Sequence, residues 1–408
     1  MTSRITFVCA ALLLLGGAAS AQTSPLVRSI QSLNPDISAI VDASGGWQSA
    51  APGYVSGDDP VLPQSSSGRA LGFTVQEVEV ALSAVVDPYL KGEVYLTIPN
   101  LGGVEVEEAV ATTTSLPWNL QVRAGSFRSA FGRQNGQHLH VQDFTQRPLV
   151  NGAFLGSDGL RGPGAQVSWL VPLPVFLTLY LEGYSLPVAT SHPATTFGGD
   201  NAGMVGLAHA KLFLEASDDL SLSLGLSSAL GRSPATELHA RDGGPLDLTP
   251  TGDTALLGFD AYLKWKPANQ TGGYFSAAWQ TEVLLRRRGA STVPDPVGTL
   301  EATWDGGLYS QVVLQLARRV NLGLRVDVLG LPASVLLPRV VKGTAALTFQ
   351  LSEFARVRIS AYAEHTGTYA ANARFGAPGL DMPTPGTDTL GLLSQLEISF
   401  GAHGAHAF

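Results

Sequence analysis

Residues 220–227 read LSLSLGLS, with a leucine at every second position and a serine or glycine between the leucines. Successive side chains of a β-strand point to opposite faces, so this stretch predicts a strand with one apolar and one polar face. The same alternation recurs in residues 259–266, 322–328 and 356–364. Such strands fit a soluble sandwich with its core inside, or an outer-membrane barrel with lipid outside and a wet lumen inside.

The lengths of the predicted strands and of their connections favour the barrel. The strands run for about 9 to 14 residues, which is longer than most soluble strands and close to the tilted membrane-spanning length. Short connections alternate with long ones along the chain, as in outer-membrane barrels. Closure of the sheet also removes the edges that so many strands would expose. We therefore expect an all-β, antiparallel transmembrane β-barrel with short periplasmic turns and long outer loops; a secreted β-sandwich is the alternative.

Counting the segments predicts a barrel of about sixteen strands, which is wide enough to leave an aqueous channel. The strands follow one another continuously from Leu71, and a first strand is expected near residues 36–41. Long loops are expected at residues 44–70, 129–162, 185–200, 231–251, 288–302 and 365–386. Weak strands are the least secure part of such a count, so about 14 or about 18 strands stay open as alternatives.

The composition excludes several classes of protein. The 408 residues are 45% hydrophobic and 14% charged, which is too apolar for an intrinsically disordered chain. The single cysteine, Cys9, cannot form a disulfide within the chain. Pro172 and Pro174 interrupt the best candidate for a spanning helix, residues 167–181, which is also shorter than the roughly 20 residues required. The formal net charge of −8 argues against a nucleic-acid partner, which needs a concentrated basic face.

The first residues are typical of a secretory signal peptide. Arg4 precedes a short apolar run, and Ala19-Ser20-Ala21 supplies a cleavage site of the A-x-A type. We expect a signal peptide over residues 1–21, a periplasmic N-terminal segment over 22–34 and the outer-membrane β-barrel over 35–408. The expected location is therefore the outer membrane of a Gram-negative bacterium, in contact with its lipid.

Several motifs resemble known outer-membrane families. The run from Glu107 to Arg133, with its Pro117-Trp118-Asn119 turn and its G-x-F and F-G elements, is similar to phosphate-selective porins. The chain more closely resembles a proteobacterial outer-membrane family often labelled zinc-regulated TonB-dependent receptor. The matching motifs are Asn34-Pro35-Asp36-Ile37-Ser38, Asn135-x-x-His138-x-His140, Asp143-Phe144, Pro148-Leu149, Phe154-Leu155-Gly156, Asp158-Gly159-Leu160, Trp169-Leu170-x-Pro172 and Gly401-Ala402-His403-Gly404-Ala405-His406-Ala407-Phe408.

The resemblance implies a porin-like channel for small hydrophilic solutes or ions, with a link to zinc uptake. Gln142 departs from that family, which tends to have a tryptophan before the Asp-Phe pair. Receptors driven by TonB are typically longer chains with a plug domain before the barrel. The segment 22–70 is too short to form such a plug, so the resemblance does not imply energised transport. A non-conducting metal-binding receptor and a structural or adhesive barrel stay open as alternatives. Phe408 resembles the terminal aromatic residue that marks barrels for the barrel-assembly machinery. By analogy with porins, a homotrimer is the expected assembly.

The third outer loop, residues 129–162, carries the candidate metal ligands. His138 and His140 are two residues apart, so in an extended segment both project to the same side, with Asp143 nearby. Imidazole nitrogens and a carboxylate suit zinc. Two histidines do not complete a tetrahedral site, so a hydrogen-bonded polar loop in the pore mouth is the alternative. His403 and His406, three residues apart, fall on opposite faces of a strand.

Charged residues share the strand face that is expected to line the lumen. They are Glu93, Glu105, Glu107, Arg123, Asp260, Lys264, Lys266, Arg325, Asp327, Arg356, Arg358 and Glu364. An arginine or lysine that faces lipid at the midplane costs about 2–4 kcal/mol, which favours the inward position. Two interpretations stay open: opposed charge rows that orient solutes or set ion selectivity, and an ion-paired wall that braces the barrel.

Motifs of enzymes are absent from the sequence. It contains no G-x-S-x-G, H-E-x-x-H or P-loop pattern. We expect no enzymatic activity, and zinc is the one cofactor that the residues suggest.

Overall fold

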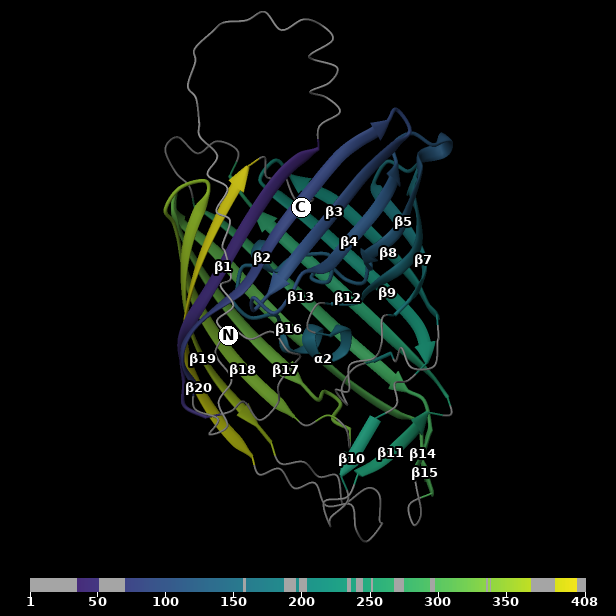
Figure 1. Ribbon diagram of the computed structural model, residues 1–408, viewed down its shortest axis with the longest axis vertical. Helices are drawn as coiled ribbons and strands as arrows, with labels where there is room; N and C mark the ends of the chain where they lie inside the picture. The colour runs from purple at the N-terminus through teal and green to yellow at the C-terminus, as the bar shows by residue number, and fades with distance from the viewer. Residues whose placement is uncertain are drawn as a thin grey trace, which may run out of the picture.

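The computed structural model describes residues 35–50, 70–156, 159–186, 196–197, 204–232, 236–239, 245–250, 252–267, 275–293, 298–334, 337, 339–367 and 386–401. Within these residues sixteen strands close into one antiparallel barrel, and the last strand pairs with the first (Figure 1). The predicted barrel and its strand count are confirmed. The expected signal peptide, His403, His406 and Phe408 lie outside the described residues.

Each barrel strand pairs with its neighbours along the chain. The barrel strands are β1 (Asp36–Gln48), β2 (Ala70–Asp87), β3 (Leu90–Pro99), β4 (Glu105–Thr113), β5 (Leu120–Arg128), β6 (Arg161–Val171), β7 (Phe176–Ser185), β8 (Met204–Ser217), β9 (Leu220–Arg232), β12 (Asp253–Trp265), β13 (Ser276–Arg288), β16 (Thr303–Ala317), β17 (Val320–Leu329), β18 (Val340–Gln350), β19 (Ala355–Thr366) and β20 (Thr387–Gly401).

Other short elements lie in the connections. A four-stranded sheet of β10 (Thr236–His239), β11 (Pro245–Pro250), β14 (Ser291–Val293) and β15 (Gly298–Leu300) lies at one end of the barrel (Figure 1). The helical elements described are α2 (Leu149–Leu155) and the 3₁₀ turns η1 (Pro117–Asn119) and η2 (Leu139–Val141). Among the described residues, helices long and apolar enough to cross a membrane are absent.

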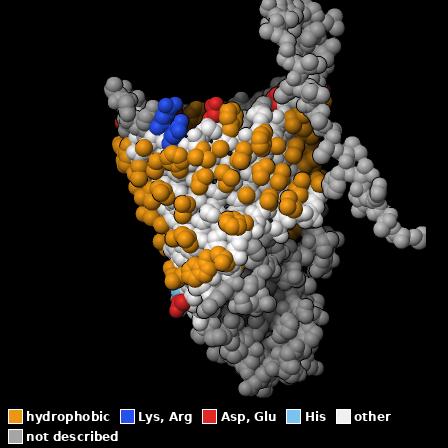
Figure 2. Space-filling model, turned by 60° about the vertical axis from the view of Figure 1, so that its left-hand side comes forward, with side chains coloured by type: hydrophobic (Ala, Val, Ile, Leu, Met, Phe, Trp, Pro, Cys, Tyr) orange, Lys and Arg blue, Asp and Glu red, His pale blue; other side chains and the backbone are white. Residues whose placement is uncertain are grey.

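The strands show the alternation that the sequence predicts. On β9, Leu226 is 63% exposed on the outside, while Ser227 is buried on the inside. On β19, Ile359 is 52% exposed and its neighbour Arg358 is only 1% exposed. Apolar side chains therefore spread over the outside of the barrel, and the charged ones in this view lie near its edges (Figure 2). Lipid is the solvent that suits an exposed apolar belt of this kind.

Exposed aromatic residues gather at the short-turn end of the barrel. Tyr89 lies in the β2–β3 turn, Phe176 begins β7, Trp265 ends β12 and Phe354 lies in the β18–β19 turn. Tyrosine and tryptophan rings have an apolar body and a polar edge, so aromatic girdles collect where a bilayer meets water. The outer surface therefore has both the apolar belt and an aromatic border.

The connection between β5 and β6, residues 129–160 and here called the β5–β6 loop, folds into the barrel. Its helix α2 packs on the inner faces of β13, β16 and β17 (Figure 1). An apolar cluster joins loop and wall: Phe131, Leu149, Val150, Ala153, Phe154, Leu155, Leu160, Tyr184, Phe197, Val205, Leu207, Ala229, Leu256, Leu284, Tyr309, Leu329, Leu337 and Val340. The sequence predicts a wet lumen, whereas this region is apolar because apolar loop residues must be covered by apolar wall residues.

Candidate functional site

Two consecutive glutamates of β4 both have buried side chains on the inner wall because the strand contains a β-bulge. Tyr95 of β3 pairs with Glu108 and Leu96 pairs with Val106, which leaves Glu107 as the extra residue. Glu107 and Glu108 are each 3% exposed, whereas Val106 is 53% exposed. Strict alternation assigns only one of the two acids to the lumen, and the bulge adds the other.

Strand β2 adds further carboxylates to this part of the wall. Glu79 is buried, and Glu77, two residues earlier on the same face, is half-buried. Val78 and Val80 alternate with them and face the other way. The inner wall at β2 and β4 is therefore strongly acidic, and buried acids of this kind require positive partners.

The β5–β6 loop brings two histidines to this acidic wall. The turn η2 begins at Leu139, so His138 caps it and His140 lies within it. Both imidazoles are buried, and their ring centroids are 5.8 Å apart. An extended segment is not needed to place them together, because the 3₁₀ turn does so.

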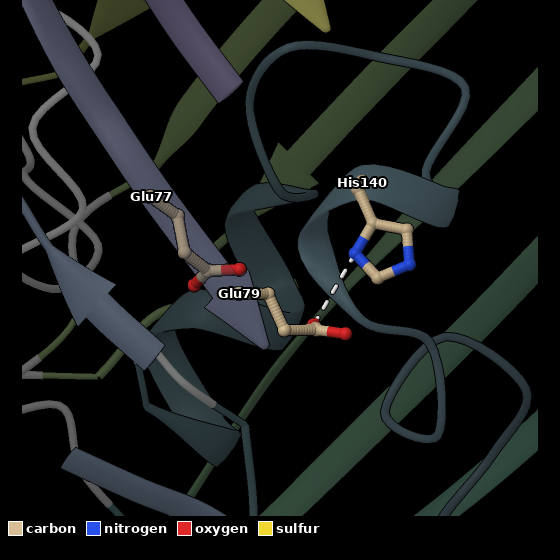
Figure 3. Close-up of side chains that lie close together, drawn as sticks. All are labelled: Glu77, Glu79 and His140. Atoms are coloured by element: carbon tan, nitrogen blue, oxygen red, sulfur yellow. Dashed lines mark ion pairs between the residues drawn. The ribbon is translucent and has the colours of Figure 1, made fainter. Parts of the chain in front are cut away.

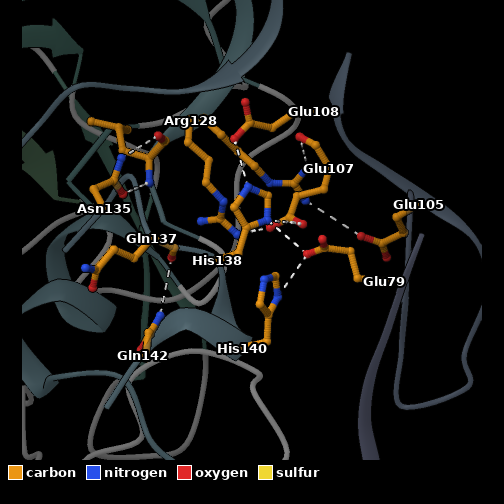
Figure 4. A network of polar contacts seen from close by, with 12 residues as sticks. Glu79, Glu105, Glu107, Glu108, Arg128, Asn135, Gln137, His138, His140 and Gln142 are labelled. Atoms are coloured by element: carbon orange, nitrogen blue, oxygen red, sulfur yellow. Dashed lines mark hydrogen bonds and ion pairs between the residues drawn. The ribbon is translucent and has the colours of Figure 1, made fainter. Parts of the chain in front are cut away.

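His138 lies among three carboxylates (Figure 4). Its Nδ1 is 3.0 Å from Oε2 of Glu79 and 3.1 Å from Oε2 of Glu107. Its Nε2 is 3.4 Å from Oε1 of Glu108. Nδ1 of His140 lies 3.3 Å from the same Glu79 oxygen (Figure 3). One oxygen of Glu79 therefore lies between two imidazole nitrogens.

Two arginines of β5 also contact the acidic wall. The Arg128 guanidinium donates from Nη2 to Oε1 of Glu107, and the Arg123 guanidinium donates from Nη2 to Oε2 of Glu108. Hydrogen bonds between charged groups are stronger than those between neutral groups. The acids, arginines and histidines therefore form one polar cluster, here called the His–Glu cluster, made of Glu77, Glu79, Glu107, Glu108, Arg123, Arg128, His138 and His140.

The two imidazoles have different proton affinities. Burial by itself lowers the pKa of His138, but its hydrogen bonds to Glu108 and Glu79 outweigh burial and raise the pKa to about 9. Burial is the largest effect on His140 and lowers its pKa from the ordinary 6.5, although Glu79 lies beside it. At neutral pH His138 is therefore protonated and His140 is neutral.

Asp143 does not join the two histidines. Its side chain is exposed, and the described residues with a spacing suited to a metal form two groups: Glu79, Glu107 and His138; and Glu77, Glu79 and His140. The carbonyl of Gln142 accepts a hydrogen bond of 2.8 Å from Nη2 of Arg358 on β19. This contact holds the chain after η2 against a different part of the wall, so Asp143 lies away from the acidic strands β2 and β4.

A second carboxylate on the wall holds the loop by its backbone. Oε1 of Glu282 on β13 accepts hydrogen bonds from the N–H groups of Arg133 (2.7 Å) and Gln134 (2.6 Å). Its Oε2 accepts a hydrogen bond of 2.9 Å from Nδ2 of Asn151 on α2. Glu282 is buried, so these bonds replace the water that its carboxylate loses.

Strand β17 holds the start of α2. Oδ1 of Asp327 accepts a hydrogen bond of 3.0 Å from the N–H group of Leu149, the first residue of α2. Nη1 of Arg325 donates a hydrogen bond of 2.9 Å to the carbonyl of Gln146. The loop is therefore fastened to β13 and β17 on one side of the lumen and to β2 and β4 on the other.

The structure places the predicted lumen-facing charges in three environments. Glu107, Asp260, Arg325, Asp327, Arg358 and Glu364 are buried; Glu93, Arg123, Lys264 and Arg356 are half-buried; Glu105 and Lys266 are exposed. Lys266 follows Trp265, the last residue of β12, and its N–H group donates to the carbonyl of Asp219 in the neighbouring turn. Lys266 therefore belongs to the turn and not to the inner wall, because the strand ends before it.

Several wall charges pair with a neighbour instead of forming opposed rows. The pairs are Arg286–Asp305 (2.8 Å), Arg325–Asp327 (2.8 Å), Arg356–Glu397 (2.6 Å) and Lys342–Glu364 (3.6 Å). Both partners of the first pair have no exposed side-chain surface. These contacts favour an ion-paired wall that braces the barrel over free rows of one sign.

Sequence reasoning did not single out Glu79 or Glu108. The alternation Glu77-Val78-Glu79-Val80 contains the signal for Glu79, because its parity is that of an inward acid. The adjacent pair Glu107-Glu108 contains the signal for a bulge, since strict alternation would turn one acid toward lipid. Neighbouring residues in the sequence give no indication that Glu79 and Glu108 lie beside His138.

Comparison with known proteins relates the chain to porins by fold. No family model matches the chain. An uncharacterized protein of Aquifex aeolicus (strain VF5) is 36% identical over 279 residues, which cover 63% of this chain. The chain thus spans about half of that relative's length, since the match covers 55% of it.

Solved structures of outer-membrane proteins have the same fold. The DcaP outer-membrane channel of Acinetobacter baumannii is similar with a TM-score of 0.54 and 10% identity, over 90% of this chain and 97% of that one. The trimer form of OmpT, an outer-membrane protein of Vibrio cholerae, has a TM-score of 0.53 and 12% identity, over 90% of this chain and 100% of that one. The anion-selective porin from Comamonas acidovorans has a TM-score of 0.51 and 12% identity, over 90% of this chain and 99% of that one. At these identities the likeness establishes a porin-like fold.

Proposed function

We propose that this chain is a porin-type channel of the outer membrane that passes small hydrophilic solutes or ions. The observation that carries the proposal is a closed barrel with an apolar outside, a charged inner wall and a loop folded into its lumen. A barrel of about sixteen strands has room for an aqueous path beside such a loop. The porin-like fold supports this function and a non-enzymatic role.

Water reaches part of the inner side of the barrel. Asp143 on the loop is exposed, and Arg133 on the loop and Lys264 on the inner face of β12 are half-buried. The guanidinium of Arg133 lies over the ring of Tyr262 on β12, 3.8 Å from its centroid. We infer that solutes pass between the loop and this charged part of the wall, where the field of these side chains selects among ions.

Single-channel recording in planar bilayers tests the proposal. Purified protein should produce discrete, equal current steps as single channels insert, because every channel has the same lumen. A preparation that inserts into the bilayer, shown by protease protection of the barrel strands, and yields no steps would contradict a channel. Protein unfolded by heat before addition is the control for conductance from contaminants.

The packing of the loop favours a second candidate, a non-conducting receptor or a structural barrel. The apolar cluster between α2 and the wall fills part of the lumen, so the loop could also close the passage. Either kind of barrel would give no current steps in the recording above, and only the receptor would bind a ligand. Single-channel recording therefore distinguishes a conducting channel from a non-conducting barrel.

We also propose the cellular setting that the sequence suggests. Removal of residues 1–21 and recognition of Phe408 by the barrel-assembly machinery would deliver the barrel to the outer membrane. A homotrimer is the proposed assembly, supported by the trimer form of the similar OmpT structure. Native mass spectrometry of the detergent-solubilised protein should show a trimeric mass, and a monomeric mass under those conditions would argue against it.

A further inference from the structure

We propose that the β5–β6 loop and the barrel wall together bind one divalent transition-metal ion of the zinc class, with Glu79, Glu107 and His138 as donors and His140, which lies beside the shared Glu79, as the fourth (Figure 4). The donors come from three separate parts of the chain: β2, β4, and the turn η2 with His138 directly before it. The ion would join the loop to the wall. This inference does not depend on whether the barrel conducts.

The chemistry of the donors suits zinc and related ions. Two imidazole nitrogens and two carboxylate oxygens are a ligand set that zinc accepts in four-coordinate sites. Calcium and magnesium prefer sites made of oxygen donors, usually with several waters in the case of magnesium. The donors of the His–Glu cluster therefore suit transition metals better than alkaline-earth ions.

The spacing of the donors also fits a metal. Two ligands that each lie about 2.0–2.1 Å from a tetrahedral zinc ion are about 3.3 Å apart. Nδ1 of His138 lies 3.0 Å and 3.1 Å from the nearest oxygens of Glu79 and Glu107, and Nδ1 of His140 lies 3.3 Å from Glu79. Glu79, Glu107 and His138 have donor atoms within 4.8 Å of one another, and so do Glu77, Glu79 and His140, so the two groups share Glu79. Rotation of His140 toward Glu107 and His138 would complete one four-coordinate site around the shared Glu79 oxygen.

Burial makes the cluster a closed site. The exposed fractions are 2% for Glu79, 3% for Glu107, 6% for His138 and 4% for His140. Where water has little access, protein side chains must fill the coordination positions of the metal. The oxygen of Glu79 that lies between the two imidazole nitrogens provides the shared ligand for such an arrangement.

The charges of the cluster favour a divalent cation. Its carboxylates belong to Glu77, Glu79, Glu107 and Glu108, and its guanidinium groups belong to Arg123 and Arg128. A divalent ion bound by two neutral imidazoles would neutralise the charge that the four carboxylates carry in excess of the two guanidinium groups. Buried charge is costly unless it is compensated, so the cluster has an electrostatic reason to take up the ion.

Isothermal titration calorimetry with zinc chloride tests the site on the full barrel in detergent after treatment with EDTA. We expect one ion per chain. Substitution of a direct ligand should weaken binding by at least about tenfold, because even indirect partners of metal ligands contribute 10–100-fold. Glu79→Gln and His138→Gln are therefore both expected to lose zinc affinity, and an excess of magnesium should not compete with zinc.

His365→Gln is the matched control. Nδ1 of His365 lies 2.7 Å from Oδ1 of Asp388, so it also forms a histidine–carboxylate pair, but both side chains are exposed. This variant should bind zinc as tightly as the parent. A parent that binds no zinc would overturn the site, and so would equal binding by the parent, Glu79→Gln and His138→Gln.

A second readout keeps the test independent of folding defects. Cobalt(II) in a four-coordinate His/carboxylate site absorbs visible light more strongly than hexaaqua cobalt, and the parent should show this absorption at one equivalent. His140→Gln should lose it while its far-ultraviolet circular dichroism stays that of the parent barrel; retention of the absorption would overturn His140 as a donor. Because these measurements involve no conduction, a failed zinc site leaves the channel proposal intact, and a silent bilayer leaves the zinc site intact.

Discussion

Nδ2 of Asn151 on the helix inside the barrel donates a hydrogen bond of 2.9 Å to Oε2 of Glu282 on strand β13. The two residues are 131 positions apart in the sequence. Glu282 binds the loop on the side of the lumen opposite the His–Glu cluster, so the loop is held at both ends of its path. The position of the loop inside the barrel therefore depends on contacts at two separate parts of the wall.

Glu282→Gln should loosen the loop. The amide of glutamine has one accepting oxygen, so it cannot accept all the hydrogen bonds that Glu282 receives from Arg133, Gln134 and Asn151. Unsatisfied buried groups cost about 1–3 kcal/mol. We expect a lower thermal midpoint and faster tryptic cleavage within the loop. Glu215→Gln, at an exposed acid of β8, is the control, and equal cleavage of both variants would contradict the anchoring role.

Asp305→Asn should destabilise the barrel more strongly. Asp305 accepts two hydrogen bonds of 2.8 Å from Nε and Nη2 of Arg286, and neither side chain has exposed surface. Removal of one partner leaves an uncompensated buried guanidinium, which costs about 3–5 kcal/mol. The measurement is the urea midpoint in detergent. Replacement of both residues, Arg286→Met with Asp305→Leu, should recover much of the loss; a double variant weaker than Asp305→Asn would show that the charges themselves are required.

If the barrel conducts as proposed, Lys264→Glu should change its ion selectivity. Lys264 lies on the face of β12 that points into the barrel and is half-buried, so its charge acts on ions in the lumen. The reversal potential in a salt gradient should shift toward cation preference. Lys266→Glu makes the same charge change at an exposed position in the turn, and its reversal potential should remain near that of the parent. Equal shifts in both variants would place the selectivity outside the lumen.

The metal-free protein should lose stability as the pH rises above neutrality. The pKa of His138 is raised to about 9 in the folded protein, from an ordinary value of 6.5. Its protonated form therefore stabilises the loop fully below about pH 6.5, and this contribution, on the order of 3 kcal/mol, is lost as the pH rises through about 9. Thermal midpoints measured in EDTA across this range should fall more steeply for the parent than for His138→Gln. Parallel curves would show that His138 does not hold this proton.

The fold could be predicted from the sequence because its signals are local. The alternation in residues 220–227 depends only on neighbouring positions, and the strand count depends on the order of short and long connections. Only part of the candidate site could be predicted from such local signals. His138 and His140 are close in the sequence, but His138 and Glu79 are 59 positions apart, and only the in-folded loop brings them together.

The errors at the site also have local physical causes. Asp143 follows His140 closely in the sequence, yet the turn η2 and the contact between Gln142 and Arg358 hold it elsewhere. Lys266 continues the alternation of β12 beyond the residue where the strand ends. Periodicity alone does not report where a strand stops or where a loop is anchored.

The bulge in β4 makes the acidity of the wall depend on chain length as well as on residue type. Glu107 is the one residue of this stretch without a partner on β3. Deletion of a single codon here would restore strict alternation and leave one carboxylate where the wall now has two. An ancestral gene could therefore gain or lose one of the two inward carboxylates of β4 through one insertion or deletion, with every other strand of the barrel left in register.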